Sequence, residues 1–420
     1  MGKVRSASRR MMASALLAGA ALAACVGGAA PARAETIHFG MSAAFTGPTR
    51  GLGIEYYRGL LACFNRVNAH GGVNGRTLAV TALDDGYDPD PCVSNTIRLV
   101  EQEKVFALLN YVGTPTTTRM LPLLLRFETR DVYLLFPFSG AEALRGPPYG
   151  GLVYNLRASY FDETEGLVGR LVDAGRTRIA VFYQADAYGR NGWDGVRRAL
   201  ERRDLAMTGE AAYNRGDPYA RDYGPEVRLL AASKPDAVIL VGSYAASAGF
   251  IRDARELGLD VPLCPVSFAD PDNMVRLLST ESERSGRNYL RGIVFSQVAP
   301  SYEDVTLPAV RAYRADMDRY ATMPPEALLR EPYAPHRYSA VSFEGYLNGL
   351  IVAEMLGRMG DDPEPGRIPE AMAALDGFDL GMGEDLDFAP GCNQGLHGVH
   401  YTVVREGRLV PLRSWREFVR

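Results

Sequence analysis

Short apolar runs alternate with longer amphipathic stretches along most of the chain. The apolar runs are about five to eight residues long and rich in β-branched and aromatic side chains, which predicts strands. The stretches between them have apolar residues at helical spacing over about ten residues or more, which predicts helices. The expected strands are residues 37–44, 77–84, 106–111, 132–136, 178–184, 236–242 and 292–298. The expected helices lie near 53–69, from 89 onward, and near 116–126, 163–174, 189–203, 219–233, 245–257 and 337–359.

Strands that alternate with helices in this way predict βαβ units and an α/β fold with parallel sheets. Seven strands are more than one such sheet usually holds, and 420 residues suffice for two cores, so we expect two doubly wound lobes. The chain would cross between them near 154–163, 296–300 and 376–386. The expected limits are 35–156 and 297–378 for lobe 1, 157–296 and 379–412 for lobe 2, and 413–420 for a C-terminal tail.

Two expected strands end in loops that are rich in threonine, serine and glycine. Thr114 to Thr117 follow strand 106–111, and Ser139 and Gly140 follow strand 132–136. Ligands of parallel sheets bind at the carboxyl ends of strands, where helix N-termini offer N–H donors that favour an anion. Each loop alone could simply cap the helix that follows. Two such loops on neighbouring strands favour a site for a carboxylate or another anion.

Residues 1–34 are expected to be an export signal. Basic residues precede an apolar stretch, 11–24, that is too short to span a bilayer. Two processing routes remain open. The sequence from Ala32 to Ala34 would allow cleavage after Ala34, whereas residues 22–25 resemble a lipoprotein box that would anchor the chain by a lipid on Cys25. Either route places the protein in the periplasm, and we expect no later stretch to cross a membrane.

Both routes leave four cysteines, Cys63, Cys92, Cys264 and Cys392, in an oxidising compartment. Cys63 lies in the first expected helix and Cys92 at the start of the second, and we expect a disulfide between them. Cys264 and Cys392 either pair or remain separate thiols. No C-x-x-C motif occurs, so a zinc site is not expected.

Charge and motifs narrow the range of functions. The formal net charge of -4 and the pI of about 5.9 leave no basic surface of the kind that nucleic acid or anionic lipid requires. The chain has no G-x-S-x-G, H-E-x-x-H, P-loop or G-x-G-x-x-G motif after the signal, so we expect neither an enzyme nor a bound cofactor or metal. Glu344, on the expected helix 337–359, is expected to be solvated.

Several sequence stretches, taken in order, resemble one protein family. They are the turn Thr46-Gly47-Pro48, "VNAHGGVNGR" followed by "DDGYDP", "RIAVFYQADAYGRNG" and "KPDAVILVGSYAASAGFIRDARELG". Together they are similar to the leucine/isoleucine/valine-type periplasmic binding proteins, the type I solute receptors of ABC importers. The resemblance implies two Rossmann-like lobes joined by three crossovers. It also implies a monomer that closes on a small-molecule ligand and delivers it to ABC permease subunits.

The resemblance also implies which residues contact the ligand. The hydroxyl that receives the ligand carboxylate falls on Thr114, and aromatic positions of the second lobe fall on Tyr188 and Tyr244. The acidic residue that pairs with an amino group falls on Ser267 or Phe268 instead, with Asp270 displaced along the chain. For each tyrosine, packing in the core is the alternative. The candidate ligand-binding residues are Tyr111, Thr114, Phe138, Ser139, Gly140, Tyr188, Tyr244 and Ser267, with Tyr160 as a further candidate.

Three positions depart from the family pattern for amino acids. Phe138 and Gly140 stand where alanine and threonine are common, and Ser267 carries no charge. An α-ammonium without a carboxylate partner would be poorly compensated in a closed cleft. We therefore expect a small carboxylate or amide with an apolar or aromatic body at least as readily as leucine. The alternative function is a sensor of the same fold that feeds a signalling receptor, and an enzyme ranks third.

Overall fold

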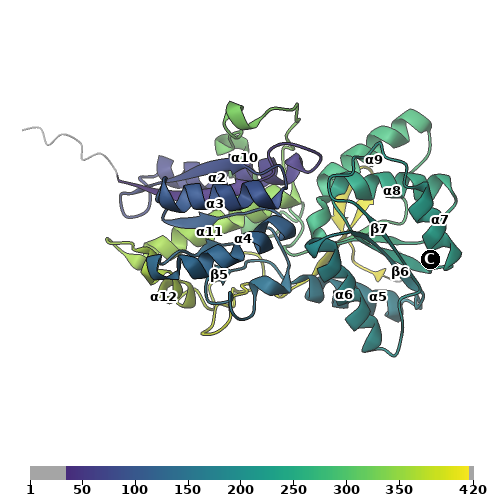
Figure 1. The fold of residues 1–420 in the computed structure, drawn as a ribbon. Helices are drawn as coiled ribbons and strands as arrows, with labels where there is room; N and C mark the ends of the chain where they lie inside the picture. The colour runs from purple at the N-terminus through teal and green to yellow at the C-terminus, as the bar shows by residue number, and fades with distance from the viewer. Residues whose placement is uncertain (1–34, 416–420) are drawn as a thin grey trace, which may run out of the picture. The chain divides into compact units, whose positions relative to one another are not determined.

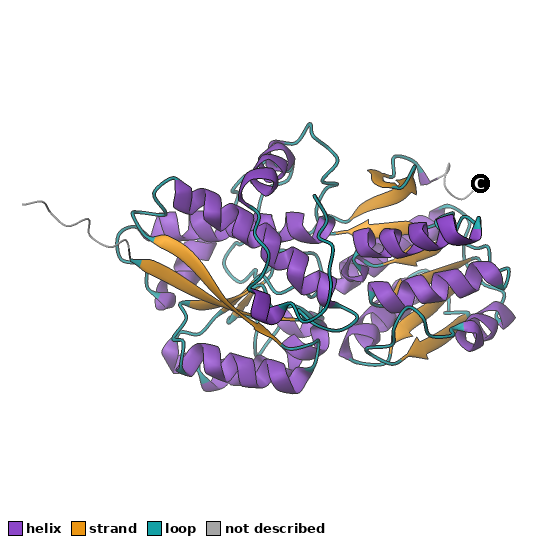
Figure 2. Ribbon diagram, turned by 90° about the horizontal axis from the view of Figure 1, so that it is seen from above, coloured by secondary structure: helices purple, strands orange, loops and turns teal. Residues whose placement is uncertain are grey.

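The computed structural model describes residues 35–415 and contains three β-sheets. The expected export signal, Cys25 included, and residues 416–420 lie outside the described residues. Two of the sheets are parallel and are flanked by helices, and the third is antiparallel (Figures 1 and 2). Within residues 35–415, no helix combines the length and apolar character needed to cross a membrane.

The first sheet has five parallel strands in the order β2-β1-β3-β4-β5. Its strands are β1 Thr36–Ala43, β2 Thr77–Asp84, β3 Ala107–Leu109, β4 Leu134–Leu135 and β5 Val153–Tyr154. The helices that belong to it early in the chain are α2 Arg50–Ala69, α3 Pro89–Glu101 and α4 Thr114–Arg126. The strand order reverses between β2 and β3, on either side of β1. In open α/β sheets the crevice at such a reversal is the usual place for a ligand.

Side-chain alternation along β1 places α2 and α3 on opposite faces of the first sheet. The ring of Phe39 lies 5.8 Å from that of Phe64 in α2. The next residue, Gly40, lies against Leu99 of α3. Successive residues of a strand point to opposite faces, so the two helices cannot share one.

This arrangement overturns the expected disulfide. Cys63 lies in α2 and Cys92 in α3, on opposite faces of the sheet, so their sulfurs cannot meet. A Cβ on Gly349 would contact Cys63, which places this thiol where α2 packs on the helix that carries Gly349. All four described cysteines are free thiols, so Cys264 and Cys392 are not paired either. Sequence distance alone gave no information about the intervening sheet.

Helices from much later in the chain complete the first lobe. They are α10 Pro308–Tyr320, α11 Ala340–Met359 and α12 Ile368–Ala373. Both α10 and α11 pack on α2, and α12 packs on α11. Figure 1 shows this as green and yellow-green helices beside the purple α2. Short 3-10 helices occupy Glu128–Arg130, Glu142–Leu144, Ser267–Ala269, Glu326–Leu328 and Pro365–Arg367.

The second sheet has four parallel strands in the order β7-β6-β8-β9. They are β6 Ile179–Gln184, β7 Gly209–Tyr213, β8 Ala237–Val241 and β9 Leu263–Pro265. Its helices are α5 Tyr160–Asp173, α6 Ala187–Glu201, α7 Gly224–Ala232, α8 Tyr244–Glu256 and α9 Pro271–Ser285. Helices α5 and α6 pack together, as do α8 and α9, and Figure 1 shows the two pairs on opposite sides of β6. Every residue of β6 and β8 is buried, as expected of strands covered on both faces.

A small antiparallel sheet extends this lobe. It contains β10 Val294–Gln297, β11 His400–Arg405 and β12 Arg408–Pro411. A bridge between Leu263 and Ile293 links it to the edge strand β9. The chain thus passes between the two sets of elements three times, after β5, after β10 and after α12. These are the two Rossmann-like lobes and three crossovers of the expected fold, while the residue limits of each lobe stay a prediction.

Two expected strands are shorter than their apolar runs. The chain leaves the first sheet at Asn110 and at Phe136, which have left-handed φ values of 56° and 52°. Such a conformation is uncommon for an aromatic residue and ends regular strand pairing. Strand β7 went unpredicted because its sequence, Gly-Glu-Ala-Ala-Tyr, lacks β-branched residues.

Candidate ligand-binding site

Three buried hydroxyls meet where β3 and β4 end. The Thr114 Oγ1 lies 2.8 Å from the Ser139 Oγ and 3.2 Å from the Tyr160 hydroxyl. Thr114 begins α4, Ser139 lies in the loop after β4, and Tyr160 is the first residue of α5. The two hydroxyl-bearing loops therefore lie side by side. A cluster of hydroxyls can donate or accept, and so can bind a carboxylate or an amide.

Three of the four threonines after β3 fall into two groups. Thr116 donates to the carbonyl oxygen of Val112 and Thr118 to that of Thr114, so both hydroxyls bond to backbone carbonyls at or just before the start of α4. Thr114 does not cap the helix, because Gly113 occupies the cap position without a side-chain bond. A Cβ at Gly113 would lie 2.4 Å from a ring carbon of Tyr87, and its φ is 109°. Glycine is required there, and it leaves Thr114 free to contact Ser139 and Tyr160.

Aromatic side chains of both lobes pack beside the hydroxyl cluster. The ring of Phe268 lies 4.5 Å from Tyr188 and 5.5 Å from Phe138. Tyr188 in turn lies 5.2 Å from Tyr160. Phe138 belongs to the loop after β4, whereas Tyr188 begins α6 and Phe268 lies in the 3-10 helix after β9. These contacts join the carboxyl ends of the two parallel sheets.

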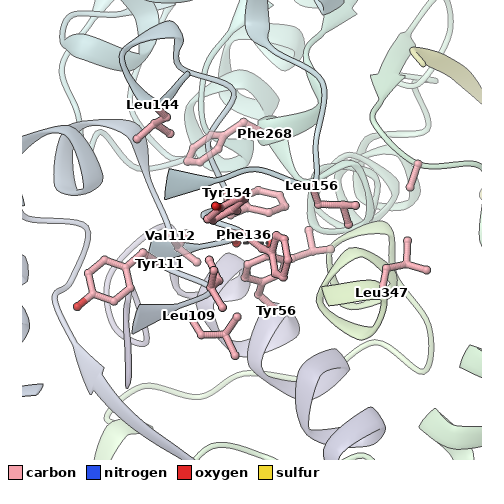
Figure 3. Close-up of a cluster of buried hydrophobic side chains, with 14 of the residues drawn as sticks. Tyr56, Leu109, Tyr111, Val112, Phe136, Leu144, Tyr154, Leu156, Phe268 and Leu347 are labelled. Carbon is pink, nitrogen blue, oxygen red and sulfur yellow. Dashed lines mark hydrogen bonds between the residues drawn. The ribbon is translucent and has the colours of Figure 1, made fainter. Parts of the chain in front are cut away.

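Two candidate tyrosines lie elsewhere. The Tyr111 hydroxyl is 3.1 Å from the Thr96 Oγ1 of α3, and Figure 3 shows it pointing away from Phe268. Tyr111 therefore packs within the first lobe, because its side chain falls on the α3 face of the sheet. The Tyr244 hydroxyl accepts a hydrogen bond from the Gly51 N–H at 3.4 Å, at a different contact between the lobes.

A buried ion pair that the sequence did not reveal borders the same cluster. The Arg157 Nε lies 3.1 Å from the Glu344 Oε1, and the two side chains are 1% and 5% exposed. The Arg157 Cζ lies 4.1 Å from the centre of the Phe138 ring, within cation–π range. The available signal was an arginine inside the largely apolar stretch "VYNLRASY".

The expectation that Glu344 is solvated is wrong. Helix α11 is buried on most of its circumference, since it packs on α2 and also borders the first crossover at Arg157. Burial raises the pKa of Glu344 to about 7, and the charge of Arg157 opposes that rise. For Arg157, burial acts to lower the pKa, but Glu344 and Glu163 outweigh it and the net shift is upward. The arginine therefore stays charged.

A family model described as periplasmic binding protein matches residues 36–407 of the chain. The chain belongs to this family. It is similar to an amino acid binding protein of Pseudomonas aeruginosa, with 24% identity over 61% of this chain and 66% of the relative. The solved structure of a possible leucine/isoleucine/valine-binding protein from Rhodopirellula baltica SH 1 is 31% identical, with a TM-score of 0.81. The matched region covers 93% of this chain and 99% of the Rhodopirellula baltica chain.

A second relative in Pseudomonas aeruginosa is a leucine-, isoleucine-, valine-, threonine- and alanine-binding protein. It is 25% identical over 54% of this chain and 59% of its own length. The chain thus spans less than two thirds of the length of these two curated relatives. The predicted resemblance to the leucine/isoleucine/valine type is confirmed.

The structure explains why this periplasmic binding protein has glycine at position 140. A Cβ there would lie 2.7 Å from the Tyr160 Cδ1 and 2.8 Å from the Tyr160 backbone nitrogen. The Gly140 carbonyl oxygen also accepts a hydrogen bond from that nitrogen. Threonine at this position would push Tyr160 away from Thr114. The tyrosine hydroxyl therefore stands beside the site in place of a threonine hydroxyl.

The carboxylate missing at Ser267 comes from another helix. Glu163 of α5 accepts hydrogen bonds of 2.8 Å from both the backbone nitrogen and the Oγ of Ser267. Its Oε2 also accepts from the Ser296 Oγ at 2.6 Å. The Glu163 carboxylate thus lies directly against Ser267, the position on which the resemblance placed the family's acidic residue. Position-by-position reasoning missed it because Glu163 is remote in sequence from Ser267.

One group of possible metal ligands occurs within the described residues. Single ligand atoms of Asp387, Cys392 and His397 lie within 4.8 Å of one another. The Gln394 amide contacts the His397 Nδ1, while its oxygen accepts from Arg145. That orientation leaves the imidazole proton on Nε2, which lies 3.1 Å from Asp387. The histidine and the aspartate are therefore in direct hydrogen-bond contact with each other.

Proposed function

We propose that this protein is an extracytoplasmic solute receptor of an ABC importer. It binds one small organic ligand between its lobes, an amino acid, an aromatic or branched carboxylate, or an amide. The observation that carries the proposal is the hydroxyl of Thr114, which contacts Ser139 of its own lobe and Tyr160 of the other. This contact lies beside the aromatic pair of Tyr188 and Phe268. The relatives, named for binding amino acids, support a ligand of this size and polarity.

The mechanism is hinge closure. Phe138 and Phe268 are in direct contact across the two lobes, so a ligand needs the lobes to move apart before it can enter. An open surface hollow is lined by Pro115 of one lobe and Ala187 of the other, the sequence neighbours of Thr114 and Tyr188. Ligand contacts with both lobes would favour the closed arrangement and shift the population toward it.

The chemistry of the cluster favours a ligand with one polar end and one apolar body. Hydroxyls and the free N–H groups at the start of α4 suit a carboxylate or carbonyl oxygen. The rings of Phe138, Tyr188 and Phe268 suit an aliphatic or aromatic body. Nothing in this arrangement requires catalysis, so binding is the whole of the proposed role.

The remaining features of the proposal follow from the family. We propose that the protein acts in the periplasm, as a monomer, with ABC permease subunits as its partners. We keep the lobe limits of 35–156 with 297–378 and of 157–296 with 379–412. We also keep the export signal over 1–34.

A thermal-shift screen of the purified protein against a metabolite library tests the function. Amino acids, aromatic acids and their amides should include compounds that raise the Tm, since a ligand bound only by the folded state stabilises it. Small-angle X-ray scattering should then show compaction with each such ligand. Ligands that stabilise the protein without compaction would overturn hinge closure, and a library without any ligand would overturn the receptor function.

A further inference from the structure

Arg157 is a buried cation with unused hydrogen-bonding capacity. Its Nη2 donates to the Ser267 Oγ at 2.8 Å and to the Glu344 Oε2 at 3.3 Å. Its Nε lies near the Glu344 Oε1 but is not aligned for a hydrogen bond, and its Nη1 has no partner. Buried donors are nearly always satisfied, because an unpaired one keeps the cost of losing water. An acceptor that is not part of the described chain would satisfy the unpaired Nη1 donor of Arg157.

The position of Arg157 connects it to the candidate site. It lies on the first crossover, between β5 and α5, and its partners come from both lobes, Ser267 after β9 and Glu344 on α11. Its guanidinium stacks on the ring of Phe138, the neighbour of Ser139. Arg157 is only 1% exposed. A ligand can therefore reach its Nη1 only by entering between the lobes.

The charges around Arg157 limit what can bind. Both carboxylate oxygens of Glu163 already accept hydrogen bonds from Ser267 and Ser296. The Glu344 Oε1, in contrast, has no hydrogen-bond partner. The groups that act on Glu344 are Arg157 on the crossover, Glu163 on α5 and Tyr56 on α2. A ligand anion would add a negative charge to one cation and two carboxylates. Glu344 can remove that excess by taking up a proton.

We propose that Arg157 is a ligand-binding residue that selects an acidic solute, whose carboxylate accepts hydrogen bonds from Nη1 while Glu344 takes up one proton. This inference rests on the proposed receptor function. Thr114 and Ser139 hydrogen-bond the ligand but add no charge to the site. Arg157 supplies the charge that distinguishes an acid from its amide, since a guanidinium donates only and binds carboxylates strongly.

Matched acids and amides test the selection. The probes are benzoate with benzamide, isovalerate with isovaleramide, and L-leucine with L-leucinamide, measured by calorimetry at pH 7. The wild type should prefer the acid of a pair, and Arg157→Gln should weaken that acid at least about tenfold while changing the amide little. Arg157→Lys should keep part of the preference. Arg255→Gln is the matched control, since Arg255 is buried in the second lobe and bonds only to carbonyl oxygens there.

Proton uptake tests the role of Glu344. Titrations in buffers of different ionisation enthalpy should show about one proton taken up per acid bound at pH 8. Acid affinity should fall about tenfold from pH 6 to pH 8, because pH 8 lies one unit above the pKa of Glu344 of about 7. Glu344→Gln imitates the protonated form, so it should bind the acid more tightly than the wild type at pH 8 and take up no proton.

Several outcomes would overturn the inference while leaving the receptor function intact. They are equal losses for acid and amide in Arg157→Gln, loss of acid binding in Glu344→Gln, and stabilising ligands that all lack a carboxylate. Failure of every probe and every library compound would instead reject the receptor function, and this inference with it. Thermal unfolding of each variant shows that the lost affinity is not lost folding.

Discussion

The Oγ1 of Thr114 lies 2.8 Å from the Oγ of Ser139, although the two residues are 25 positions apart in the chain. They meet because β3 and β4 are parallel neighbours and both strands end early, at left-handed residues. The contact places two hydroxyls of one lobe beside Tyr160, at the start of the other. The proposed ligand site is built on this pair.

Thr114→Val should weaken a carboxylate ligand by about 1–3 kcal/mol, because it removes a hydrogen bond to a charged group. The measurement is calorimetry with a carboxylate found in the thermal-shift screen. Thr118→Val is the matched control, since the Thr118 hydroxyl donates to a carbonyl oxygen within α4. Unchanged affinity in Thr114→Val would mean that the anion site lies elsewhere.

Gly140→Ala should destabilise the fold by about 1–3 kcal/mol, because the added Cβ would overlap Tyr160. It should also weaken ligand binding, since Tyr160 must move away from Thr114. Chemical denaturation measures the first effect. Gly146→Ala is the control, as a Cβ there meets nothing within 4 Å, and its change should stay within about 0.5 kcal/mol. Equal stability of the two variants would contradict the close approach of Gly140 to Tyr160.

The thiols should react in a defined order. Iodoacetamide at pH 8 should label the half-buried Cys392 in the native protein and leave Cys63 and Cys264 unmodified. Burial raises the pKa of Cys63 and of Cys264 to about 12, which leaves little thiolate and no access to it. Unfolded protein should label at all of the described cysteines without prior reduction. A Cys63–Cys92 crosslink in non-reducing peptide mapping would show that the helices do not lie on opposite faces.

Stability should fall as the pH rises from about 5 to 8. Burial raises the pKa of Asp270 to about 7 and that of Asp272 to about 6, from an ordinary value of 3.8 for each. The folded state therefore binds more protons than the unfolded state between these limits. The resulting stability is full below the unfolded pKa and is lost as the pH passes the folded pKa. Urea denaturation at several pH values measures the effect.

Asp270→Asn should flatten this pH profile. Asparagine keeps the cap of α9, where Asp270 accepts from the Asn273 N–H, and it tolerates the left-handed φ of 52°. It removes the buried charge. Asp88→Asn is the control, because Asp88 caps α3 in the same way but is exposed. If stability falls as steeply with pH in Asp270→Asn as in the wild type, Asp270 does not cause the pH dependence.

Much of the fold could be predicted, but only part of the site. The strands at 37–44 and 178–184 could be predicted because a strand covered on both faces needs a continuous apolar run. Thr114 and Ser139 could be named as site candidates because they follow such strands. Tyr111 lies outside the hydroxyl cluster, because its side chain falls on the α3 face of the sheet, where its hydroxyl contacts Thr96. Arg157 and Glu163 were not named at all, and Glu344 was assigned to solvent.

The amino-acid sequence alone was enough to infer the alternation of strands and helices, the division into two α/β lobes and the hydroxyl-rich loops at two strand ends. These depend on local periodicity and on residues adjacent in the chain. The folded structure was needed to show which thiols can meet, which tyrosines lie beside the hydroxyl cluster, and that Arg157 and Glu344 form a buried pair. Those depend on which face a side chain occupies and on contacts between distant segments, and local patterns contain neither.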